Sequence, residues 1–399
     1  MARYAVNPQT SPESLAEIVD TVMPTVIDIR RHLHRHPELS GQEKATARFV
    51  AERCKNLGLD VREHIGGFGL LACLQQAETR PYIALRADMD ALPILETATS
   101  DYISENTGIA HACGHDAHTA MLIGAMMALQ NLGDLPYNVA AIFQPAEETT
   151  AGAAAMIRDG VLDSIRPLRM HALHVYPYLP SGSIGLRTGA TCASADMFEV
   201  EISGHGGHAA RPHECTDTIL IASHIIQALH HIVSRRVDPM QPAVLTIGQI
   251  EGGHAPNVIP ERVAFSGTIR TLDHQVRDEI RTRMDHIIRQ TAETWGATAS
   301  FTMKATTPLL ENPPEIMRLT EAALRRFMPD TPLLRIDAPS MGGEDFAEFL
   351  HKVPGCLLRL GTGSAPNTRH PLHHPAFDID EQAMATGVAA LVSLCLMET

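Results

Sequence analysis

The order of helix and strand patterns along the chain constrains its fold more than any other feature. Up to about residue 190, and again after about residue 306, helical patterns alternate with short apolar strands. That alternation predicts βαβ units on a mixed, largely parallel sheet flanked by helices. Between Thr191 and Thr306 the order changes to strand, helix, strand, strand, helix, strand, which is typical of a ferredoxin-like α+β module. The sequence therefore predicts an α/β domain made of residues 1–190 and 307–399, interrupted by a ferredoxin-like domain at residues 191–306.

Each predicted element rests on hydrophobic spacing and on the residues that start or stop it. Ser11 and Pro12, for example, suit the first turn of a helix, because Ser caps free backbone N–H groups and Pro lacks one. In the larger domain we expect helices at 11–29, 43–57, 117–132, 151–158, 314–327, 344–352 and 381–397, and strands at 70–74, 82–87, 138–143 and 171–175. In the inserted domain we expect strands at 196–202, 243–250, 262–271 and 298–304, and helices at 217–233 and 273–294.

The charge and the apolar content of the chain exclude several classes of partner. Lys and Arg number 32 against 46 Asp and Glu, a net charge of −14, so the surface should repel nucleic-acid phosphates and anionic lipid heads. The longest mostly apolar stretch, residues 120–129, is much shorter than the ~20 residues of a membrane span. The seven cysteines are scattered and lack CxxC spacing, and the N-terminus lacks the layout of a secretion signal. We therefore expect a cytoplasmic protein without a disulfide framework that binds neither nucleic acid nor membranes.

The histidine content points to metal ligation or proton transfer, since 22 His stand beside only 10 Phe, 6 Tyr and 1 Trp. The densest cluster is HACGHDAH, which runs from His111 to His118. Cys113 and His115 can share one ion only on an extended or looped connection, because residues two apart on a helix point to nearly opposite sides. Gly114 permits such a loop, and a thiolate with an imidazole suits zinc or a comparable transition metal. The alternative is a buried filler cysteine among surface or capping histidines.

A pair of carboxylates, Glu147 and Glu148, follows the apolar strand at 138–143. Pro145 must end the ladder of that strand, which puts both carboxylates at the carboxyl end of a strand, where active sites of such sheets lie. If one of them binds a metal ion, the other is free to act as a general base. The alternative is the N-terminus of a helix, where acidic residues are favoured by the helix dipole.

The remaining candidates are single residues at strand ends or in flexible turns. They are His174, His373 or its neighbour His374, His208, and the pair Asp88 and Asp90. Carboxylates placed like the aspartate pair commonly orient the histidines that ligate a metal. The glycines around His208 allow its imidazole to approach another surface. Ordinary structural roles for these single residues remain open.

Ten sequence motifs occur together in a fixed order along nearly the whole chain. They are RRHLHRHPELSGQE (30–43), LRADMDALP (85–93), HACGHDAHTA (111–120), FQPAEE (143–148), LHVYP (173–177), GHGGHAARPH (204–213), NVIP (257–260), GTIRT (267–271), MGGEDFAEFL (341–350) and LHHPAFDID (372–380). This set closely resembles the amidohydrolase branch of the aminoacylase and carboxypeptidase metallohydrolase family, the branch of hippurate hydrolases and indoleacetyl-amino-acid hydrolases. The resemblance implies a zinc-peptidase-like α/β domain interrupted by a ferredoxin-like lid.

The resemblance also implies roles for individual residues. A site for two divalent metal ions, zinc or manganese with cobalt or nickel as further candidates, would be held by Cys113 as the bridge and by His115, Glu148, His174 and His373. His373 is preferred to His374 because the ligand of the family lies two positions before a proline. Glu147 would be the general base. His208 would stabilise an oxyanion, in its own or a neighbouring subunit's site, and Asn257 and Arg270 would bind a substrate carboxylate.

The implied reaction is hydrolysis of the amide bond of small N-acyl-L-amino acids, hippurate-like, N-acetyl or aryl-acyl, to a carboxylate and a free amino acid. The implied assembly is a homodimer or homotetramer formed through the lid. Thr149, Thr150 and Ala151 replace a glycine-rich stretch usual in the family, so the resemblance leaves the acyl preference open. A dipeptidase or carboxypeptidase of the same family, and a non-catalytic metal-dependent binding protein, are the alternatives.

Overall fold

The computed structural model describes residues 10–397, which form two units. The first unit holds the chain up to Gly189, Glu311–Ala338 and the chain from Glu348 onward, and the second holds Ala190–Leu310 and Pro339–Ala347. The last of these segments is expected in the second part of the α/β domain. It belongs to the second unit because Ser340 exchanges backbone hydrogen bonds with Thr191 and Ala193.

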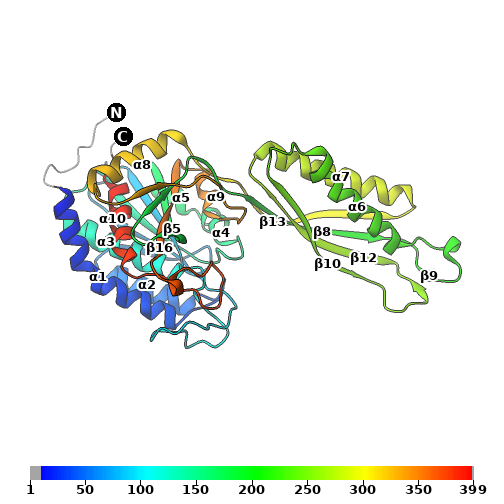
Figure 1. Ribbon diagram of the computed structural model, residues 1–399, viewed down its shortest axis with the longest axis horizontal. Helices are drawn as coiled ribbons and strands as arrows, with labels where there is room; N and C mark the ends of the chain where they lie inside the picture. The colour runs from blue at the N-terminus through cyan, green and yellow to red at the C-terminus, as the bar shows by residue number, and fades with distance from the viewer. Residues whose placement is uncertain (1–9, 398–399) are drawn as a thin grey trace. The chain divides into compact units, whose positions relative to one another are not determined.

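The first unit is built on an eight-stranded sheet with strand order β1-β2-β4-β3-β5-β16-β6-β15. Figure 1 shows this unit with helices around the sheet. The central strands β4, β3, β5 and β16 run parallel, whereas β1 and β2 pair antiparallel at one edge. Its strands are β1 Asp60–Ile65, β2 Gly69–Leu74, β3 Tyr82–Asp88, β4 Asn138–Gln144, β5 Arg169–Pro180, β6 Ile184–Leu186, β15 Leu333–Arg335 and β16 Gly355–Gly363. Its helices are α1 Pro12–Arg35, α2 Lys44–Asn56, α3 His115–Leu132, α4 Gly152–Arg158, α5 Val161–Ile165, α8 Pro314–Phe327, the short turn η2 Pro366–Thr368 and α10 Ala383–Cys395. Together with the inserted unit below, this mixed sheet confirms the predicted fold class.

Apolar periodicity decides how the helices of this unit pack. α1 starts at the predicted cap, where the Ser11 and Ser14 side chains each accept a hydrogen bond from the other's backbone N–H. α3 is apolar on nearly every side, as a helix covered all round must be, and it packs against α1, α10 and β3. The sequence prediction missed β16, whose nine residues are all buried. A short apolar run interrupted by glycines carries neither the helical nor the alternating pattern.

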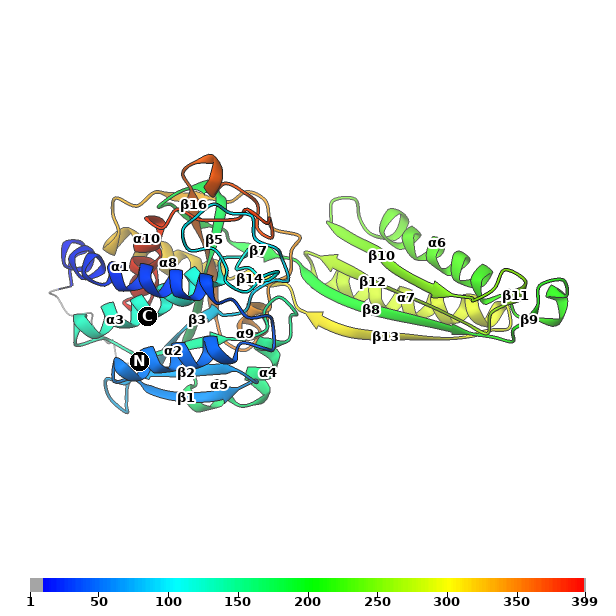
Figure 2. The ribbon, with the colours of Figure 1, turned by 90° about the horizontal axis from the view of Figure 1, so that it is seen from below.

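The inserted unit is a four-stranded antiparallel sheet of order β10-β12-β8-β13 with α6 and α7 on one face (Figure 2). It consists of β8 Ser194–Ser203, β9 Gly207–His208, η1 Pro212–Glu214, α6 Thr218–Arg236, β10 Ala243–Gly252, β11 Val258–Ile259, β12 Arg262–Thr271, α7 His274–Thr294 and β13 Thr298–Thr307. The chain passes between the two units through β7 Gly189–Cys192, β14 Leu310–Asn312 and α9 Phe346–Leu350. The strand-helix-strand-strand-helix-strand order is as predicted.

Strand register brings polar residues to one edge of the large sheet. Asp88 at the end of β3 lies opposite Gln144 at the end of β4. Arg86 pairs with Ala172, so Asp88 and His174, each two residues further on, reach the same edge. Carboxyl ends of parallel strands carry the ligand sites of open α/β sheets. The candidate residues of β3, β4 and β5 therefore meet at this edge.

The cysteines and the helices bear on where such a chain can function. All seven cysteines are free thiols, and only Cys215 is not fully buried. Among residues 10–397, none of the helices combines the length and the apolar character that crossing a membrane requires. The cysteines therefore contribute packing or chemistry to the fold, not covalent cross-links.

Buried charges tie α1 to the start of α3. The Arg30 guanidinium, 1% exposed, donates hydrogen bonds to Asp116, Asp378 and Glu381. One turn further along α1, His34 donates from Nδ1 to Asp116 (2.8 Å) and from Nε2 to Glu96 (2.9 Å). Carboxylates only accept, so both ring nitrogens of His34 carry protons. Burial would lower the pKa of His34, but Asp116 and Glu96 outweigh it and raise the pKa to about 9.

We expect the His34 imidazolium to make the stability of the metal-free protein fall in mildly alkaline solution. Its pKa in the unfolded chain is near 6.5, so its contribution is fully present below pH 6.5 and is lost as pH rises through about 9. The shift corresponds to about 3 kcal/mol. Denaturant unfolding of His34→Gln should show a deficit relative to wild type that shrinks between pH 6.5 and 9.5. His36→Gln, at an exposed position of the same helix end, should show a constant difference. A His34→Gln deficit that is equally large at both pH values would contradict the prediction.

Candidate metal centre

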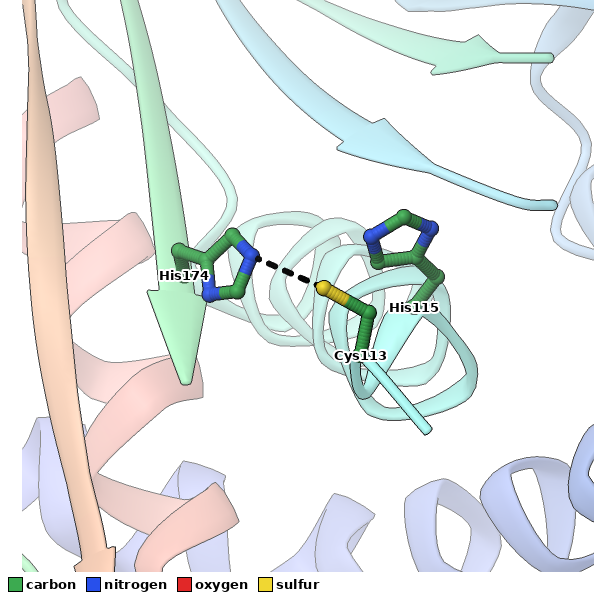
Figure 3. A group of neighbouring side chains, drawn as sticks. All are labelled: Cys113, His115 and His174. Carbon is green, nitrogen blue, oxygen red and sulfur yellow. Dashed lines mark hydrogen bonds between the residues drawn. The ribbon is translucent and has the colours of Figure 1, made fainter. Parts of the chain in front are cut away.

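Three metal-ligating side chains converge where α3 begins beside β5. Cys113 lies in the loop before α3, His115 is the first residue of α3, and His174 lies on β5. Their donor atoms lie within 4.8 Å of one another, and Cys113 Sγ is 3.6 Å from His174 Nε2 (Figure 3). Gly114 allows this approach, because its φ is +84° and a Cβ there would lie 2.5 Å from Val175 Cγ2.

The position of His115 differs from the expectation that Cys113 and His115 both lie on a loop before the helix. α3 begins at His115, not at Ala117. Gly114, in the left-handed conformation, turns the chain between Cys113 and His115. The two side chains therefore meet at the N-terminus of a helix, although they are only two residues apart.

Hydrogen bonds fix which nitrogen of each imidazole is available. His174 Nδ1 donates to the carbonyl oxygen of Val175 (2.7 Å), which leaves the lone pair of Nε2 facing Cys113. His115 Nδ1 donates to the backbone oxygen of Asp90 (3.0 Å) and to its carboxylate (3.2 Å). His115 Nε2 is buried and has no hydrogen-bond partner among the described residues. Both rings thus turn Nε2 toward the same space. Burial lowers the pKa of His115, but the Asp88 carboxylate and Cys113 outweigh it and hold that pKa well above its usual value, so a metal ion bound there would displace a proton from His115.

The second half of the site is made by the carboxylates that follow β4 and by the C-terminal histidine pair. Glu148 Oε1 lies 3.8 Å from His115 Nε2 and 3.5 Å from His373 Nε2. Cys113, Glu148 and His373 have donor atoms within 4.8 Å of one another, and so do His115, Glu147 and Glu148. Cys113 thus belongs to two overlapping groups, one with His174 and one with His373.

The backbone selects His373 over His374 for this site. His373 has a φ of +66°, and its N–H donates to the carbonyl oxygen of Ala112, one residue before Cys113 (2.8 Å). The ring of His374 instead stacks on His370 and accepts a hydrogen bond from the backbone of Ala376. His373 is therefore the member of the pair that faces Glu148.

The donors present fit divalent transition-metal ions. Burial raises the pKa of the Cys113 thiol well above its usual range, so a thiolate there needs a compensating cation. Burial lowers the pKa of His174 well below its usual range, which keeps the ring in the neutral form that ligates. His115 Nε2 and Glu148 Oε1 are buried atoms with no hydrogen-bond partner among the described residues. Such unpaired polar atoms destabilise the fold unless an ion binds them. Thiolate, imidazole and carboxylate together suit zinc or a similar ion.

Asp90 connects the two halves of the site. Its Oδ1 accepts from His115 Nδ1, and its Oδ2 accepts from the backbone N–H of Glu148 (2.9 Å) and from the hydroxyl of Ser40 (2.7 Å). One buried carboxylate thereby sets the orientation of His115 and the position of the Glu148 backbone.

Asp88 makes its direct hydrogen bonds to groups other than the candidate ligands. It accepts from Arg86 (2.7 Å) and from His118 Nδ1 (2.6 Å). His118 Nε2 accepts the backbone N–H of Val175 (2.9 Å), so both nitrogens of His118 are engaged. Asp88 therefore acts through His118 on the end of β5, beside His174. Its Oδ2 also lies 3.6 Å from Nε2 of the candidate ligand His115. Sequence reasoning gave His118 no role, and its only signal is its spacing of three residues from His115 on the same helix.

The turn after β4 is tightly built. Ala146 has a φ of +53°, and the backbone N–H groups of Ala151 and Gly152 both donate to its carbonyl oxygen. A Cβ at Gly152 would lie 1.6 Å from the carbonyl oxygen of Pro145. A left-handed alanine costs about 1–2 kcal/mol, so surrounding contacts must hold the turn that carries Glu147.

Of the three predicted residues of the inserted unit, His208 and Asn257 lie near one end of the unit and Arg270 lies toward the other. His208 of β9 pairs with Val258 of β11, and Asn257 immediately precedes that strand. Figure 2 shows β9 and β11 together at one end of the inserted unit. β12 begins at Arg262, near this end, and reaches Arg270 eight residues later, a run of about 26 Å at 3.3 Å per residue. A single small substrate in one subunit therefore cannot touch both Arg270 and His208.

Arg270 carries a charge with no hydrogen-bonded acid. Among residues 10–397, no carboxylate accepts a hydrogen bond from it. The nearby Asp196 accepts two hydrogen bonds from Arg277 instead, at 2.6 and 2.8 Å. Burial lowers the pKa of Arg270, although the guanidinium stays charged. A Cβ at Gly343 would lie 3.0 Å from Arg270 Nη1. The guanidinium is thus available to an anion.

Comparison with known proteins finds relatives that are described as hydrolases, one of them with a dinuclear metal site. The pattern of peptidase family M20/M25/M40 matches residues 84–397. The N-acetyl-L-cysteine deacetylase of Bacillus subtilis is 42% identical over 368 residues, 92% of this chain and 86% of that protein. Thermostable carboxypeptidase 2 of Saccharolobus solfataricus is 35% identical over 390 residues, 96% and 98% of the two chains. The crystal structure of the Bacillus subtilis YXEP protein, described as a dinuclear metal binding peptidase, superposes with a TM-score of 0.79 at 33% identity, covering 94% and 98%.

Proposed function

The chain belongs to peptidase family M20/M25/M40 and is a metallohydrolase, and from this we propose that it hydrolyses the amide bond of N-acyl-L-amino acids. The observation that carries the proposal is the convergence of Cys113, His115, Glu148, His174 and His373 beside a further carboxylate, Glu147. The products would be a carboxylate and a free amino acid. The seven free cysteines support a cytoplasmic location for this reaction.

The five ligating residues would hold two divalent ions, and Cys113 is the residue that belongs to both the donor group with His174 and the donor group with His373. Zinc and manganese are our first candidates, and cobalt and nickel are further ones. Bound there, such ions supply Lewis acidity toward the amide carbonyl and lower the pKa of water toward neutrality. Asp90 orients His115, and the Val175 carbonyl orients His174, so that each keeps Nε2 available.

Glu147 has the position that a general base needs. It is 8% exposed, and a carboxylate oxygen lies within 4.8 Å of donor atoms of His115 and Glu148. It would accept a proton from the attacking water and return it to the leaving nitrogen, which departs as the amine of the amino acid.

Arg270 is proposed to bind the carboxylate of the amino-acid product. We expect Arg270→Met to lower kcat/KM by about 10–100-fold, because a charge-assisted hydrogen bond contributes about 1.5–3 kcal/mol. Arg262→Met is a matched control on the same strand, since Arg262 is exposed and paired with Glu201, and it should leave kcat/KM unchanged. Steady-state kinetics with an N-acetyl amino acid and with its carboxamide test this. If Arg270→Met discriminates between the two substrates as wild type does, the assignment is wrong.

His208 and Asn257 are proposed to reach the substrate of a neighbouring subunit, in a homodimer or homotetramer. The length of β12 that separates them from Arg270 supports this. His208→Ala and Glu147→Gln should each be nearly inactive, since loss of an oxyanion donor costs about 10²–10³ in kcat. Mixed and allowed to exchange subunits, they should regain about a quarter of wild-type activity, because half of the dimers then hold one complete site. A mixture as inactive as its components would place His208 in its own subunit's site.

The alternatives within the family are a dipeptidase and a carboxypeptidase. The carboxypeptidase alternative is supported by the relative named Thermostable carboxypeptidase 2. The test is a panel of N-acetyl, N-benzoyl and N-indoleacetyl amino acids beside unmodified dipeptides, with metal-stripped protein given Mn²⁺ or Zn²⁺. Metal-dependent release from acylated substrates supports the proposal and ranks the acyl groups. Cleavage of dipeptides alone would replace it by a peptidase function. Metal binding without turnover of any substrate would favour a binding protein.

A further inference from the structure

A buried glutamate far from Glu147 in sequence contacts the turn that carries it. Glu43 stands at the start of α2 and is 0% exposed. Its Oε1 accepts two backbone hydrogen bonds, from Gly41 (2.9 Å) and from Ala146 (2.8 Å). Ala146 immediately precedes Glu147 and holds the left-handed φ of +53°. Glu43 therefore contacts the backbone at the strained residue of this turn.

The Glu43 side chain does not cap α2, although it lies at the N-terminus of that helix. Acidic residues at the N-terminus of a helix cap its free N–H groups, but the Glu43 side chain makes no cap hydrogen bond to α2. That task falls to Glu38, whose carboxylate accepts from Ala45 (3.1 Å) and Thr46 (2.7 Å). The helix is thus capped without Glu43, whose carboxylate is directed at Ala146.

The same segment also contacts the other half of the site. The Ser40 hydroxyl donates to Asp90 Oδ2 (2.7 Å), the atom that also accepts the backbone N–H of Glu148 (2.9 Å). The segment from Ser40 to Glu43 thereby contacts Ala146 directly and Glu148 through Asp90. Two contacts on either side of Glu147 determine where its backbone can lie.

The placement of Glu43 is costly for the fold. Its Oε2 is buried and has no hydrogen-bond partner within the described residues, and burial raises the pKa of the carboxyl. An unpaired buried polar atom is destabilising, so an apolar residue would serve packing better here. The cost is explained if the carboxylate is needed for the turn after β4.

We propose that Glu43 is a positioning residue, which holds Ala146 in its left-handed conformation so that Glu147 and Glu148 face the metal centre. The inference rests on the roles proposed above for these two glutamates. Glu43 touches neither metal nor substrate, and it acts only through the backbone N–H of Ala146.

The test compares Glu43→Leu, which removes the acceptor, with Glu43→Gln, which keeps Oε1. For Glu43→Leu we expect kcat to fall about 10–100-fold at nearly unchanged KM, and metal affinity measured by chelator competition to fall about tenfold, the usual range for residues behind metal ligands. Backbone amides of residues 146–152 should exchange hydrogen faster. Glu43→Gln should stay within about threefold of wild type in kcat and metal affinity. Glu38→Ala is the matched control, which should lower thermal stability and leave metal affinity and the exchange of 146–152 unchanged.

Wild-type exchange at residues 146–152 and wild-type metal affinity in Glu43→Leu would overturn the inference. Both readouts are independent of the substrate, so they separate this inference from the proposed reaction, whose failure would appear as silence of the wild-type enzyme on the substrate panel. If Glu43→Leu does not fold, Glu43→Asp takes its place. Its carboxylate is one methylene shorter and should lose the Ala146 contact with the same consequences.

Discussion

Replacing Glu147 with Gln is expected to lower kcat for N-acyl-amino-acid hydrolysis by about 10²–10⁴-fold, the usual contribution of a general acid-base residue. Gln keeps the size of the side chain and its hydrogen-bonding oxygen but cannot accept a proton. Because the five residues that we assign as ligands are unchanged, the metal content should stay at the wild-type level. Steady-state kinetics together with metal content by mass spectrometry measure both quantities.

Glu148→Gln provides the contrast, because it makes the same chemical change at the adjacent position. Glu148 Oε1 faces both His115 and His373, so its replacement should weaken metal binding as well as turnover. If instead Glu147→Gln emptied the site and Glu148→Gln kept it full, the two roles would have to be exchanged. If neither variant changed kcat, the general-base mechanism would fail.

Replacing Cys113 with Ala is expected to reduce activity to background and to lose bound metal. Cys113 is the one donor common to the group with His174 and the group with His373, so its loss affects both ions at once. Metal content after dialysis and a chelator-competition titration measure the loss. Adding excess metal should restore little activity, because the remaining donors lack the shared ligand.

Cys54→Ala is the control for this experiment. Cys54 is another fully buried free thiol, on α2, and its replacement makes a similar cavity away from the donors. It should lower stability slightly and keep metal and turnover. Full metal occupancy in Cys113→Ala, equal to that of Cys54→Ala, would remove Cys113 from the ligand set.

Local sequence patterns predicted most elements of both units. α1 begins at the capping residue expected for it, and the six main elements of the inserted unit occur in the predicted order. These elements can be predicted from the sequence because their caps and their apolar spacing are local properties. β16 was missed because Arg359 and the glycines at positions 361 and 363 interrupt its apolar run, which leaves neither a continuous apolar nor an alternating pattern. Pro339–Ala347 was expected in the α/β domain, because the pairing of Ser340 with Thr191 and Ala193 depends on partners distant in sequence.

The candidate site was visible in the sequence only in part. HACGHD and the glutamate pair stand out as clusters, whereas His174 and His373 are single histidines that only the family resemblance ties to the same site. Nothing in the sequence alone says that His118 serves Asp88 and Val175 and is not itself an available donor. Its spacing from His115 would have suited a ligand equally well.

The sequence by itself determined the two folding patterns, the chemistry of the donor residues and the strand ends at which those residues lie. Periodicity, capping and residue type are properties of short stretches of sequence. Only the tertiary structure decided which imidazole nitrogens are available, which of His373 and His374 faces Glu148, and which residue contacts the turn before Glu147. These choices depend on hydrogen bonds between distant residues, such as that between Ala146 and Glu43, 103 positions apart. Such contacts leave no local pattern, since they exist only once the sheet brings its strand ends together.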